Sequence, residues 1–347
     1  MANDWILTRI EGRAGRITFN RPAALNALDH DMAMAIEAAI DGWRDDPTVA
    51  LIVIDAVGEK AFCAGGDIAA VYRAGIAGDL RPGRDFWRDE YRMNAKIAEY
   101  PKPVVSFMQG FVMGGGVGVG GHASQRIAGD TTQIAMPETG IGLIPDVGGT
   151  LILARAPGRV GEYLGLTGGR IGAADALYAG FADHYLPEAE WPGLIARLVE
   201  TGDPGVIPRG LVPAAKGQLA DRRPQIEAGF GGRDIHEIVA SLEAAGTQFA
   251  ADTLKVLRRN SALSLEATLR LVRMTRAEPT IRAALSNEFR FTFRAVEEAD
   301  FLEGVRAQII DKDRNPQWKY SPETLPMAEV TRLLAPVPSG WEIDFAA

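Results

Sequence analysis

Hydrophobic residues in the first half of the chain occur in short continuous runs that alternate with helical patterns and glycine-rich loops. Residues 5–19 contain two short extended runs around a glycine turn, which predicts a β-hairpin. Residues 49–56 form an uninterrupted apolar run of strand length, as expected for a strand buried on both faces. Residues 101–110 contain a second run of this kind. These segments predict a sheet with parallel strands.

Helical spacing appears between these runs. Asp29 is a predicted helix N-cap, because apolar residues follow it at helical intervals, from Met32 to Trp43. A second helix is expected from Ile68, and a longer charged helix over 84–100. Strand and helix alternate up to about Leu186, a pattern typical of an α/β core.

The pattern changes in the last part of the chain. Residues 187–235 are rich in proline, glycine and charge, and predict a hinge or a set of short helices. From Ile235 to Arg314 the amphipathic pattern is almost wholly helical. We therefore expect an α/β core over residues 1–205 and a helical C-terminal region over residues 206–347.

Composition and charge indicate which kinds of molecule the protein is not expected to bind. The 347 residues include 37 Lys and Arg against 45 Asp and Glu, giving a net charge of −8. Such a chain lacks the basic surface that nucleic acid binding needs. We find no pattern typical of a signal peptide at the N-terminus and no apolar run long enough for a membrane span. The single cysteine, Cys63, makes no internal disulfide. These features predict a cytoplasmic protein that binds neither nucleic acid nor membrane.

Most signatures of cofactor and metal chemistry are absent from the sequence. There is no P-loop and no zinc-protease or serine-hydrolase motif, and the four histidines are scattered. Residues 116–121 do satisfy the GxGxxG pattern of dinucleotide sites. The match lies mid-chain among extra glycines and without a clear acidic partner, so close packing or a ligand-facing turn is favoured instead. We predict no metal and no bound cofactor.

Two glycine-rich loops follow predicted strands, at residues 61–67 and 113–116. Each can present backbone N–H groups at the start of a helix. Two such donors aimed at one oxygen would form an oxyanion hole, which stabilises negative charge in acyl transfer. Spacing alone is equally consistent with two ordinary strand–helix turns.

Two carboxylates, Glu138 and Asp146, lie in an apolar segment rich in proline and glycine. Burial raises the pKa of a carboxyl group, which suits general acid–base chemistry. Asp146 could equally cap the helix expected after it. Glu138 has no such alternative, and we interpret it as a catalytic candidate.

Four segments in series resemble the crotonase (enoyl-CoA hydratase/isomerase) superfamily: residues 17–28, 61–71, 102–120 and 136–150. The resemblance implies a spiral of ββα units with C-terminal helices that close the site. A closer likeness to the hydrolase subgroup extends through 86–103 and 298–318.

The resemblance also implies roles for individual residues. Backbone N–H groups of Ala64 and Gly115 would form the oxyanion hole around a thioester carbonyl. Glu138 would be the acid–base carboxylate, and Asp146 and Glu90 would be additional acidic residues around the acyl group and its hydroxyl. The remaining substrate-binding positions would be Gly65, Gly66, Asp67 and Gly114.

One position departs from the hydratase pattern. Hydratases of the superfamily usually carry a second catalytic glutamate where this chain has Gly118. Adding water across a double bond requires two positioned carboxylates, so hydrolysis is favoured. The implied reaction converts 3-hydroxyisobutyryl-CoA and water to 3-hydroxyisobutyrate and coenzyme A, a step of valine breakdown. Glu138 would act either as general base or as a nucleophile that forms an anhydride.

Two other functions remain open at this stage. The first is hydration or isomerisation of an enoyl-CoA by Glu138 alone, and the second is acyl-CoA binding without catalysis. Cys63 is disfavoured as a nucleophile, because no histidine lies near it in the sequence to activate it. The resemblance is also compatible with a homo-oligomer.

Overall fold

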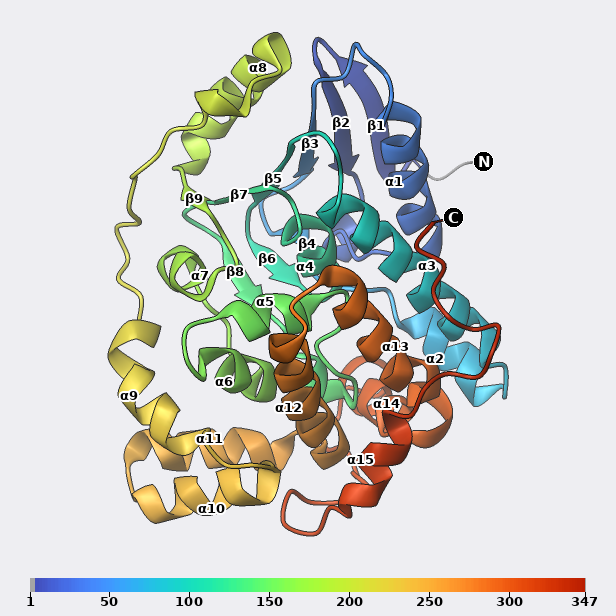
Figure 1. Cartoon of the computed structure of the whole chain (residues 1–347), viewed down its shortest axis with the longest axis vertical. Helices are drawn as coiled ribbons and strands as arrows, with labels where there is room; N and C mark the ends of the chain where they lie inside the picture. The colour runs from blue at the N-terminus through green and yellow to red at the C-terminus, as the bar shows by residue number, and fades with distance from the viewer. Residues whose placement is uncertain (1–3, 347) are drawn as a thin grey trace. The chain divides into compact units, whose positions relative to one another are not determined.

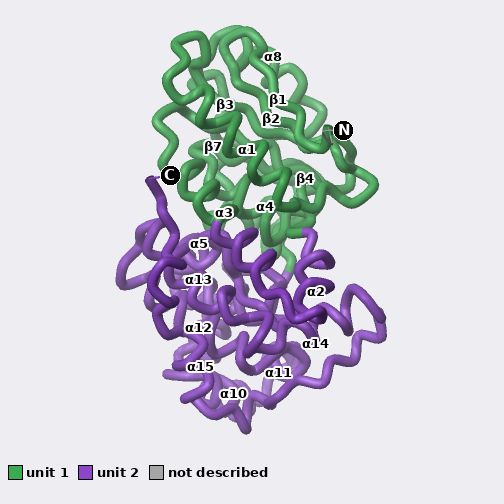
Figure 2. Tube along the Cα trace, turned by 90° about the vertical axis from the view of Figure 1, so that its right-hand side faces the viewer, with its two compact units in different colours: residues 1–66, 89–135, 170–218 green, residues 67–88, 136–169, 219–347 purple. Residues whose placement is uncertain are grey.

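The computed structural model describes residues 4–346 and divides them into two compact units. Figure 2 shows the two units in different colours. The units interleave along the chain, whereas the sequence suggested a linear division after residue 205. Of the described residues, unit 1 contains those up to 66 together with 89–135 and 170–218, and unit 2 contains 67–88, 136–169 and those from 219 onward.

The larger sheet of unit 1 has six strands (Figure 1). The first pair is the antiparallel hairpin expected over 5–19, and every other neighbouring pair is parallel. The strands, in order across the sheet, are β1 (Ile6–Glu11), β2 (Ala14–Phe19), β3 (Leu51–Ala56), β5 (Val104–Met108), β7 (Gln125–Ala128) and β9 (His184–Tyr185).

A smaller parallel sheet carries the two glycine-rich loops. It pairs β4 (Ala61–Cys63) with β6 (Phe111–Met113), and β6 with β8 (Gln133–Ala135). Parallel strands have their carboxyl ends at one edge of the sheet. The loops that follow β4 and β6 therefore begin side by side.

Helices of unit 1 pack against these sheets. Helix α1 (His30–Trp43) begins at Asp29, whose carboxylate accepts a hydrogen bond from Met32 N at 2.9 Å, as predicted. Helix α3 (Arg81–Ala98) starts in unit 2 and continues into unit 1. The other helices of this unit are η1 (Pro22–Ala24), α4 (Gly115–Gly120), α7 (Ala173–Ala179), η3 (Glu188–Glu190), α8 (Trp191–Thr201) and η4 (Pro204–Val206).

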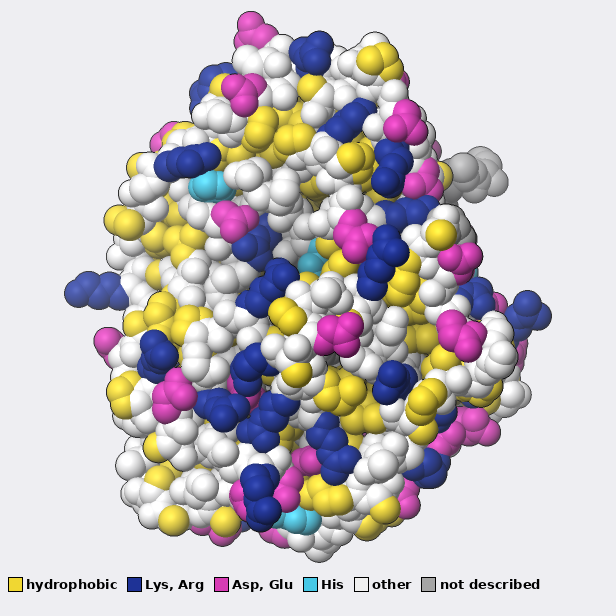
Figure 3. Space-filling model, in the orientation of Figure 1, with side chains coloured by type: hydrophobic (Ala, Val, Ile, Leu, Met, Phe, Trp, Pro, Cys, Tyr) yellow, Lys and Arg dark blue, Asp and Glu magenta, His cyan; other side chains and the backbone are white. Residues whose placement is uncertain are grey.

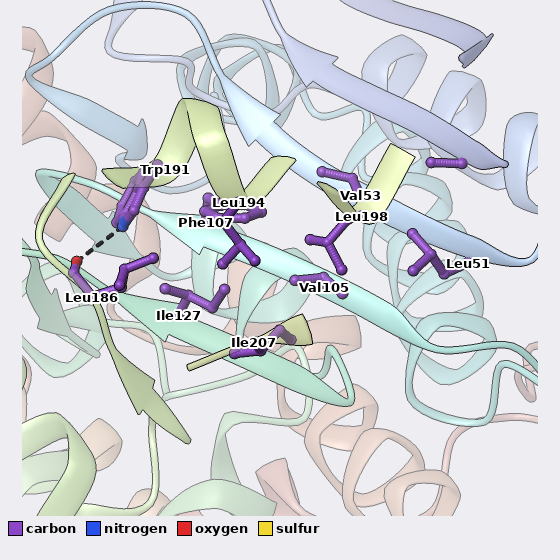
Figure 4. Close-up of a cluster of buried hydrophobic side chains, with 11 residues drawn as sticks. Leu51, Val53, Val105, Phe107, Ile127, Leu186, Trp191, Leu194, Leu198 and Ile207 are labelled. Carbon is purple, nitrogen blue, oxygen red and sulfur yellow. Dashed lines mark hydrogen bonds between the residues drawn. The ribbon is translucent and has the colours of Figure 1, made fainter. Parts of the chain in front are cut away.

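A hydrophobic core lies between the large sheet and α8. Figure 4 shows Leu194 and Leu198 pointing at Val105 and Phe107 of the sheet. The Trp191 ring packs edge-on against Phe107 and donates to the Leu186 carbonyl at 2.9 Å. Of the two alternatives predicted for residues 187–235, a hinge or a set of short helices, the structure shows short helices, and α8 is the one that covers the core.

Unit 2 is helical, which confirms the pattern predicted for residues 235–314. Its main helices include α12, α13 and α5, which pack on one another. The helices of this unit are α2 (Ala69–Ile76), η2 (Glu138–Ile141), α5 (Gly149–Arg155), α6 (Val160–Thr167), α9 (Leu219–Gly229), α10 (Ile235–Ala245), α11 (Gln248–Arg259), α12 (Ala262–Ala277), α13 (Ile281–Glu298), α14 (Phe301–Val305), η5 (Arg306–Ile310, a π-helix) and α15 (Met327–Leu333).

The surface carries charges of both signs. On the face drawn in Figure 3, Asp and Glu side chains lie among those of Lys and Arg, with small apolar areas between them. Within residues 4–346, no helix combines the length and the apolar character needed to cross a membrane.

Candidate functional site

The two glycine-rich loops lie against each other at the carboxyl ends of β4 and β6. A Cβ built on Gly116 would lie only 2.2 Å from the Cys63 carbonyl oxygen, so only glycine permits this approach. A Cβ on Gly65 would lie 3.5 Å from the Met113 carbonyl oxygen. Gly65 also has φ +113°, a conformation that L side chains rarely adopt. The structure therefore brings together loops that are about 50 residues apart in the chain.

One predicted donor needs correction. The backbone N–H of Ala64 donates to the Leu25 carbonyl at 3.1 Å, so this hydrogen bond within the fold uses the N–H that was assigned to the oxyanion hole. Two residues further on, the Gly66 nitrogen lies 3.6 Å from a Cβ built on Gly115. Among the described residues, no backbone carbonyl accepts a hydrogen bond from Gly66 N–H. Gly66 therefore replaces Ala64 as the candidate donor beside Gly115.

Gly115 is the first residue of α4, where N–H groups have no acceptor within the helix. Its neighbour Gly114 has φ +46°, which turns the chain sharply into the helix. The strand–glycine–helix arrangement predicted for residues 113–116 is confirmed. It leaves an N–H at the end of the small sheet for an anionic or carbonyl oxygen.

Glu90 lies beside these loops. Its side chain is buried, and its Oε1 lies 2.9 Å from the position that a Cβ on Gly115 would occupy. Helix α3 is held in place by ion pairs to α1, among them the contact of Arg92 Nη2 with Glu37 Oε2 at 2.7 Å. Burial raises the pKa of Glu37, but hydrogen bonds from Arg92 and Lys96 outweigh it and lower that pKa. A charged network thus fixes the helix that carries Glu90.

Glu138 begins η2 in unit 2 and is 5% exposed. The next residue, Thr139, is tied to the junction between α11 and α12. Its hydroxyl accepts from Asn260 Nδ2 at 3.0 Å, and its carbonyl accepts from Ser261 N at 3.0 Å. These bonds fix the backbone at Glu138, as a catalytic carboxylate requires.

Asp146 is also buried in unit 2, at 4% exposure. The sequence left open whether it caps the following helix, and the structure places the N-cap of α5 at Gly148 instead. The carboxylate that caps this helix comes from Glu288 on α13, which accepts from Gly148 N at 2.8 Å and Thr150 N at 3.1 Å.

Glu288 is a buried carboxyl group that was not predicted from the sequence as part of the site. It is fully buried, and burial raises its pKa to about 8, opposed by hydrogen bonds from Thr150 and Gly148. The negative charge of Asp146 raises that pKa further. A signal was present, because Glu288 falls on the same helical stripe as the buried residues Ile281, Ala284, Leu285, Thr292 and Ala295.

Other candidates have structural roles. The Cys63 thiol is fully buried, and burial raises its pKa to about 12, so the reactive thiolate is disfavoured at neutral pH. Gly116 and Gly118 of the GxGxxG match are buried inside α4 and Gly121 is its C-cap, so the match does not lie on the loop before the helix, where a diphosphate would bind. Within the described part of the chain, no group of three or more His, Cys, Asp or Glu side chains is arranged to hold a metal ion.

The predicted positions thus fall into two groups. Unit 1 brings together Glu90 and the loop residues Gly65, Gly66, Gly114 and Gly115. Asp67, Glu138 and Asp146 belong to unit 2, where Asp67 is partly exposed and the two other carboxylates are buried.

Comparison with known proteins identifies the class. The family model for enoyl-CoA hydratase/isomerase matches residues 14–334, and the chain belongs to this family. The 3-hydroxyisobutyryl-CoA hydrolase, mitochondrial, of Gallus gallus is 39% identical over 90% of this chain and 84% of its own length.

Two solved structures share the fold closely. An enoyl-CoA hydratase from Rhodobacter sphaeroides is 55% identical, with a TM-score of 0.94 over 98% of this chain and 99% of that one. A carnitinyl-CoA dehydratase from Mycobacterium thermoresistibile is 37% identical, with a TM-score of 0.92 over 99% of both chains. These matches confirm the predicted crotonase-like α/β fold with its helical C-terminal region.

Proposed function

We propose that this chain hydrolyses the thioester of 3-hydroxyisobutyryl-CoA, giving 3-hydroxyisobutyrate and coenzyme A. The observation that carries the proposal lies at Gly118, inside α4. This residue is buried and has no side chain, so it brings no carboxylate to the two loops. A site without a second catalytic glutamate suits attack of water on a carbonyl better than its addition to a double bond.

In this proposal the thioester carbonyl binds to the N–H groups of Gly66 and Gly115. Negative charge develops on that oxygen when the carbonyl is attacked, and prepositioned N–H groups stabilise it. Hydrolysis then breaks the carbon–sulfur bond. The coenzyme A thiolate leaves and takes up a proton, while the acyl carbon gains the oxygen of water.

Glu138 supplies the carboxylate that drives this attack. As a general base it removes a proton from water, and as a nucleophile it forms an anhydride that water then cleaves. Both routes need an ionisable carboxyl group at residue 138. Asp146 orients the attacking water or the substrate hydroxyl, and Glu90 binds the 3-hydroxyl group. Gly65, Asp67 and Gly114 line the path of coenzyme A.

Hydration of an enoyl-CoA is the second candidate function. The 55% identity to a protein named an enoyl-CoA hydratase favours it. The 39% identity over 90% of the chain to a protein named a hydrolase favours hydrolysis. Gly118 also favours hydrolysis over hydration, because it brings no second carboxylate.

The proposal is tested by measuring free thiol released from 3-hydroxyisobutyryl-CoA, with crotonyl-CoA followed in parallel by its enoyl absorbance. Thiol release without change in crotonyl-CoA supports the hydrolase. Loss of enoyl absorbance without thiol release would support the hydratase instead.

We also propose that coenzyme A enters only as part of the substrate, that no separate cofactor is needed, and that the step belongs to valine breakdown. A cytoplasmic location is consistent with the buried, reduced Cys63. The related Gallus gallus protein is named mitochondrial, so fractionation of the source cells is the relevant measurement. Assembly as a homo-oligomer is tested by sedimentation.

A further inference from the structure

We infer that Glu288 is a positioning residue for Asp146: it holds the loop 146–150 in the one conformation that presents the Asp146 carboxylate. The inference rests on the proposed function for the role of Asp146. It rests on the contacts within unit 2 for the role of Glu288.

Both oxygens of Glu288 bind this loop. Oε2 accepts from Gly148 N at 2.8 Å, and Oε1 accepts from Thr150 N at 3.1 Å and from the Thr150 hydroxyl. The Thr150 hydroxyl lies 3.1 Å from that of Thr275 on α12. Either of these two hydroxyls can be the donor. Helices α12 and α13 thus hold the loop through one chain of hydrogen bonds.

The loop needs such support because its backbone is strained. Val147, directly after Asp146, has φ +54°, a conformation that is unfavourable for a β-branched residue. Gly148 follows with φ +78°, and Gly149 N donates to the Asp146 carbonyl at 2.6 Å. A conformation of this kind persists only where the surroundings impose it, and such residues cluster at functional sites.

The surroundings of the loop are closely packed. Glu288, Thr150 and Thr275 are each fully buried. A Cβ on Gly149 would lie 2.5 Å from the end of the Met136 side chain. The negative charge of Asp146 acts directly on Glu288. Removing the Glu288 hydrogen bonds would therefore free the backbone on both sides of Gly148, directly after Asp146.

A carboxyl group is specifically required here. Each of its oxygens faces a backbone N–H donor, and a glutamine amide has only one acceptor oxygen. In Glu288→Gln the amide NH2 group would face either Gly148 N–H or Thr150 N–H. The substitution keeps the shape of the side chain and removes one of the two anchors.

The chain offers a matched control in Glu266 on α12. Glu266 is also buried, at 1% exposure, and accepts a hydrogen bond from a backbone N–H, that of Ile235, at 2.9 Å. Glu266 lies in unit 2, as Glu288 does, but it binds the start of α10 and not the loop 146–150. Glu266 Oε1 also accepts from Arg270 Nε at 2.7 Å, so Glu266→Gln weakens an ion pair in addition to placing glutamine at a buried, N–H-binding position, and it sets an upper limit for the general cost of such a substitution.

The test compares Glu288→Gln, Glu266→Gln and wild type in hydrolysis of 3-hydroxyisobutyryl-CoA. We expect kcat of Glu288→Gln to fall on the order of 10- to 100-fold with KM nearly unchanged, because misplacement of a reacting group lowers turnover. Glu266→Gln should stay close to wild type. Because Glu288 acts through Asp146, the double variant Glu288→Gln/Asp146→Asn should be no slower than Asp146→Asn. Equal losses in the two glutamine variants, or multiplicative losses in the double variant, would overturn the inference.

A second pair of variants removes only the hydroxyl contact. Thr150→Val should lower kcat in the same direction as Glu288→Gln, and Thr150→Ser, which keeps the hydroxyl, should restore it. If Glu288→Gln does not fold, this pair still tests whether the hydrogen bonds to Glu288 position Asp146. Equal kcat values for Thr150→Val and Thr150→Ser would count against the inference.

Hydrogen exchange separates failure of this inference from failure of the proposed function. The amides of Gly148 and Thr150 should exchange at least about tenfold faster in Glu288→Gln than in wild type, while that of Ile235 should not change. If wild type releases no thiol, the hydrolase proposal fails, and this exchange pattern still tests the anchoring. Unchanged exchange at Gly148 and Thr150 would overturn the inference whatever the activity.

Discussion

The carboxyl oxygen Oε1 of Glu90 lies 2.9 Å from the point where a Cβ on residue 115 would stand. Residue 115 therefore has to be glycine because of Glu90, and not only because it begins α4. Any side chain there would push Glu90 away or shift the backbone of residue 115, whose Cβ would also lie 3.6 Å from the Gly66 nitrogen. The two residues form one geometric unit, in which a helix carboxylate and a candidate oxyanion donor depend on each other.

This relationship predicts the effect of Gly115→Ala. The methyl group should displace Glu90 or the residue 115 N–H and lower kcat on the order of 100-fold, as loss of oxyanion stabilisation does. Gly42→Ala on α1 is the matched control, because no atom outside the neighbouring backbone of α1 lies within 4 Å of its new methyl group. Steady-state kinetics on both variants check this. Wild-type turnover in Gly115→Ala would mean that Glu90 and Gly115 are not part of the site.

Glu90→Gln tests the assignment of the 3-hydroxyl group. We expect hydrolysis of 3-hydroxyisobutyryl-CoA to fall roughly 10- to 100-fold, because a charge-assisted hydrogen bond to the substrate is lost. Hydrolysis of isobutyryl-CoA, which lacks the hydroxyl, should change little. The measurement is the ratio of kcat/KM for the two thioesters, and an unchanged ratio contradicts the role of Glu90.

The elements around the site were largely predictable from the sequence. Asp29 was predicted as an N-cap, and the strand–glycine–helix order around Gly115 was evident from the run of residues. Sequence spacing could not identify which N–H of the 64–66 loop has an acceptor in the fold. Ala64 N–H is bound by Leu25, about 40 residues earlier in the chain, a contact that depends on how the chain folds back.

Cys63→Ala should leave turnover within about threefold of wild type, because the buried thiol is neutral and its pKa is about 12. The lost packing should lower the free energy of unfolding by roughly 1 kcal/mol. Kinetics and urea unfolding of the same preparation check both expectations. A loss of activity on the order of 100-fold would indicate that the thiol takes part in the reaction.

The stability of the fold should depend on pH through Glu288. Its folded-state pKa is about 8, above the usual 4.5, so the folded chain holds this proton more tightly than the unfolded chain. The stabilisation is therefore complete below about pH 4.5. It is lost as the pH rises from there through about 8, at a slope of at most about 1.4 kcal/mol per pH unit. Urea unfolding of wild type and Glu288→Gln over this range checks the slope.

In Glu288→Gln this contribution to the slope should disappear, because the amide does not titrate. Glu266→Gln serves again as the control for a buried substitution. If the stability curves of wild type and Glu288→Gln run parallel between about pH 5 and about pH 8, Glu288 does not titrate as described.

Glu288 also marks the limit of what the sequence could disclose. Its position on the buried stripe of α13 was visible from periodicity, but its partners Gly148 and Thr150 lie about 140 residues away. Only the packing of α13 against α5 reveals that this carboxyl group caps the helix after Asp146.

Product analysis with 3-hydroxyisobutyryl-CoA tests the proposed activity most directly. The same substrate gives 3-hydroxyisobutyrate and free coenzyme A by hydrolysis, but methacrylyl-CoA by loss of water. With wild type we predict free coenzyme A and the hydroxy acid in equal amounts by mass spectrometry, and neither product above background with Glu138→Gln. Formation of methacrylyl-CoA with the thioester intact would contradict the hydrolase and establish a hydratase.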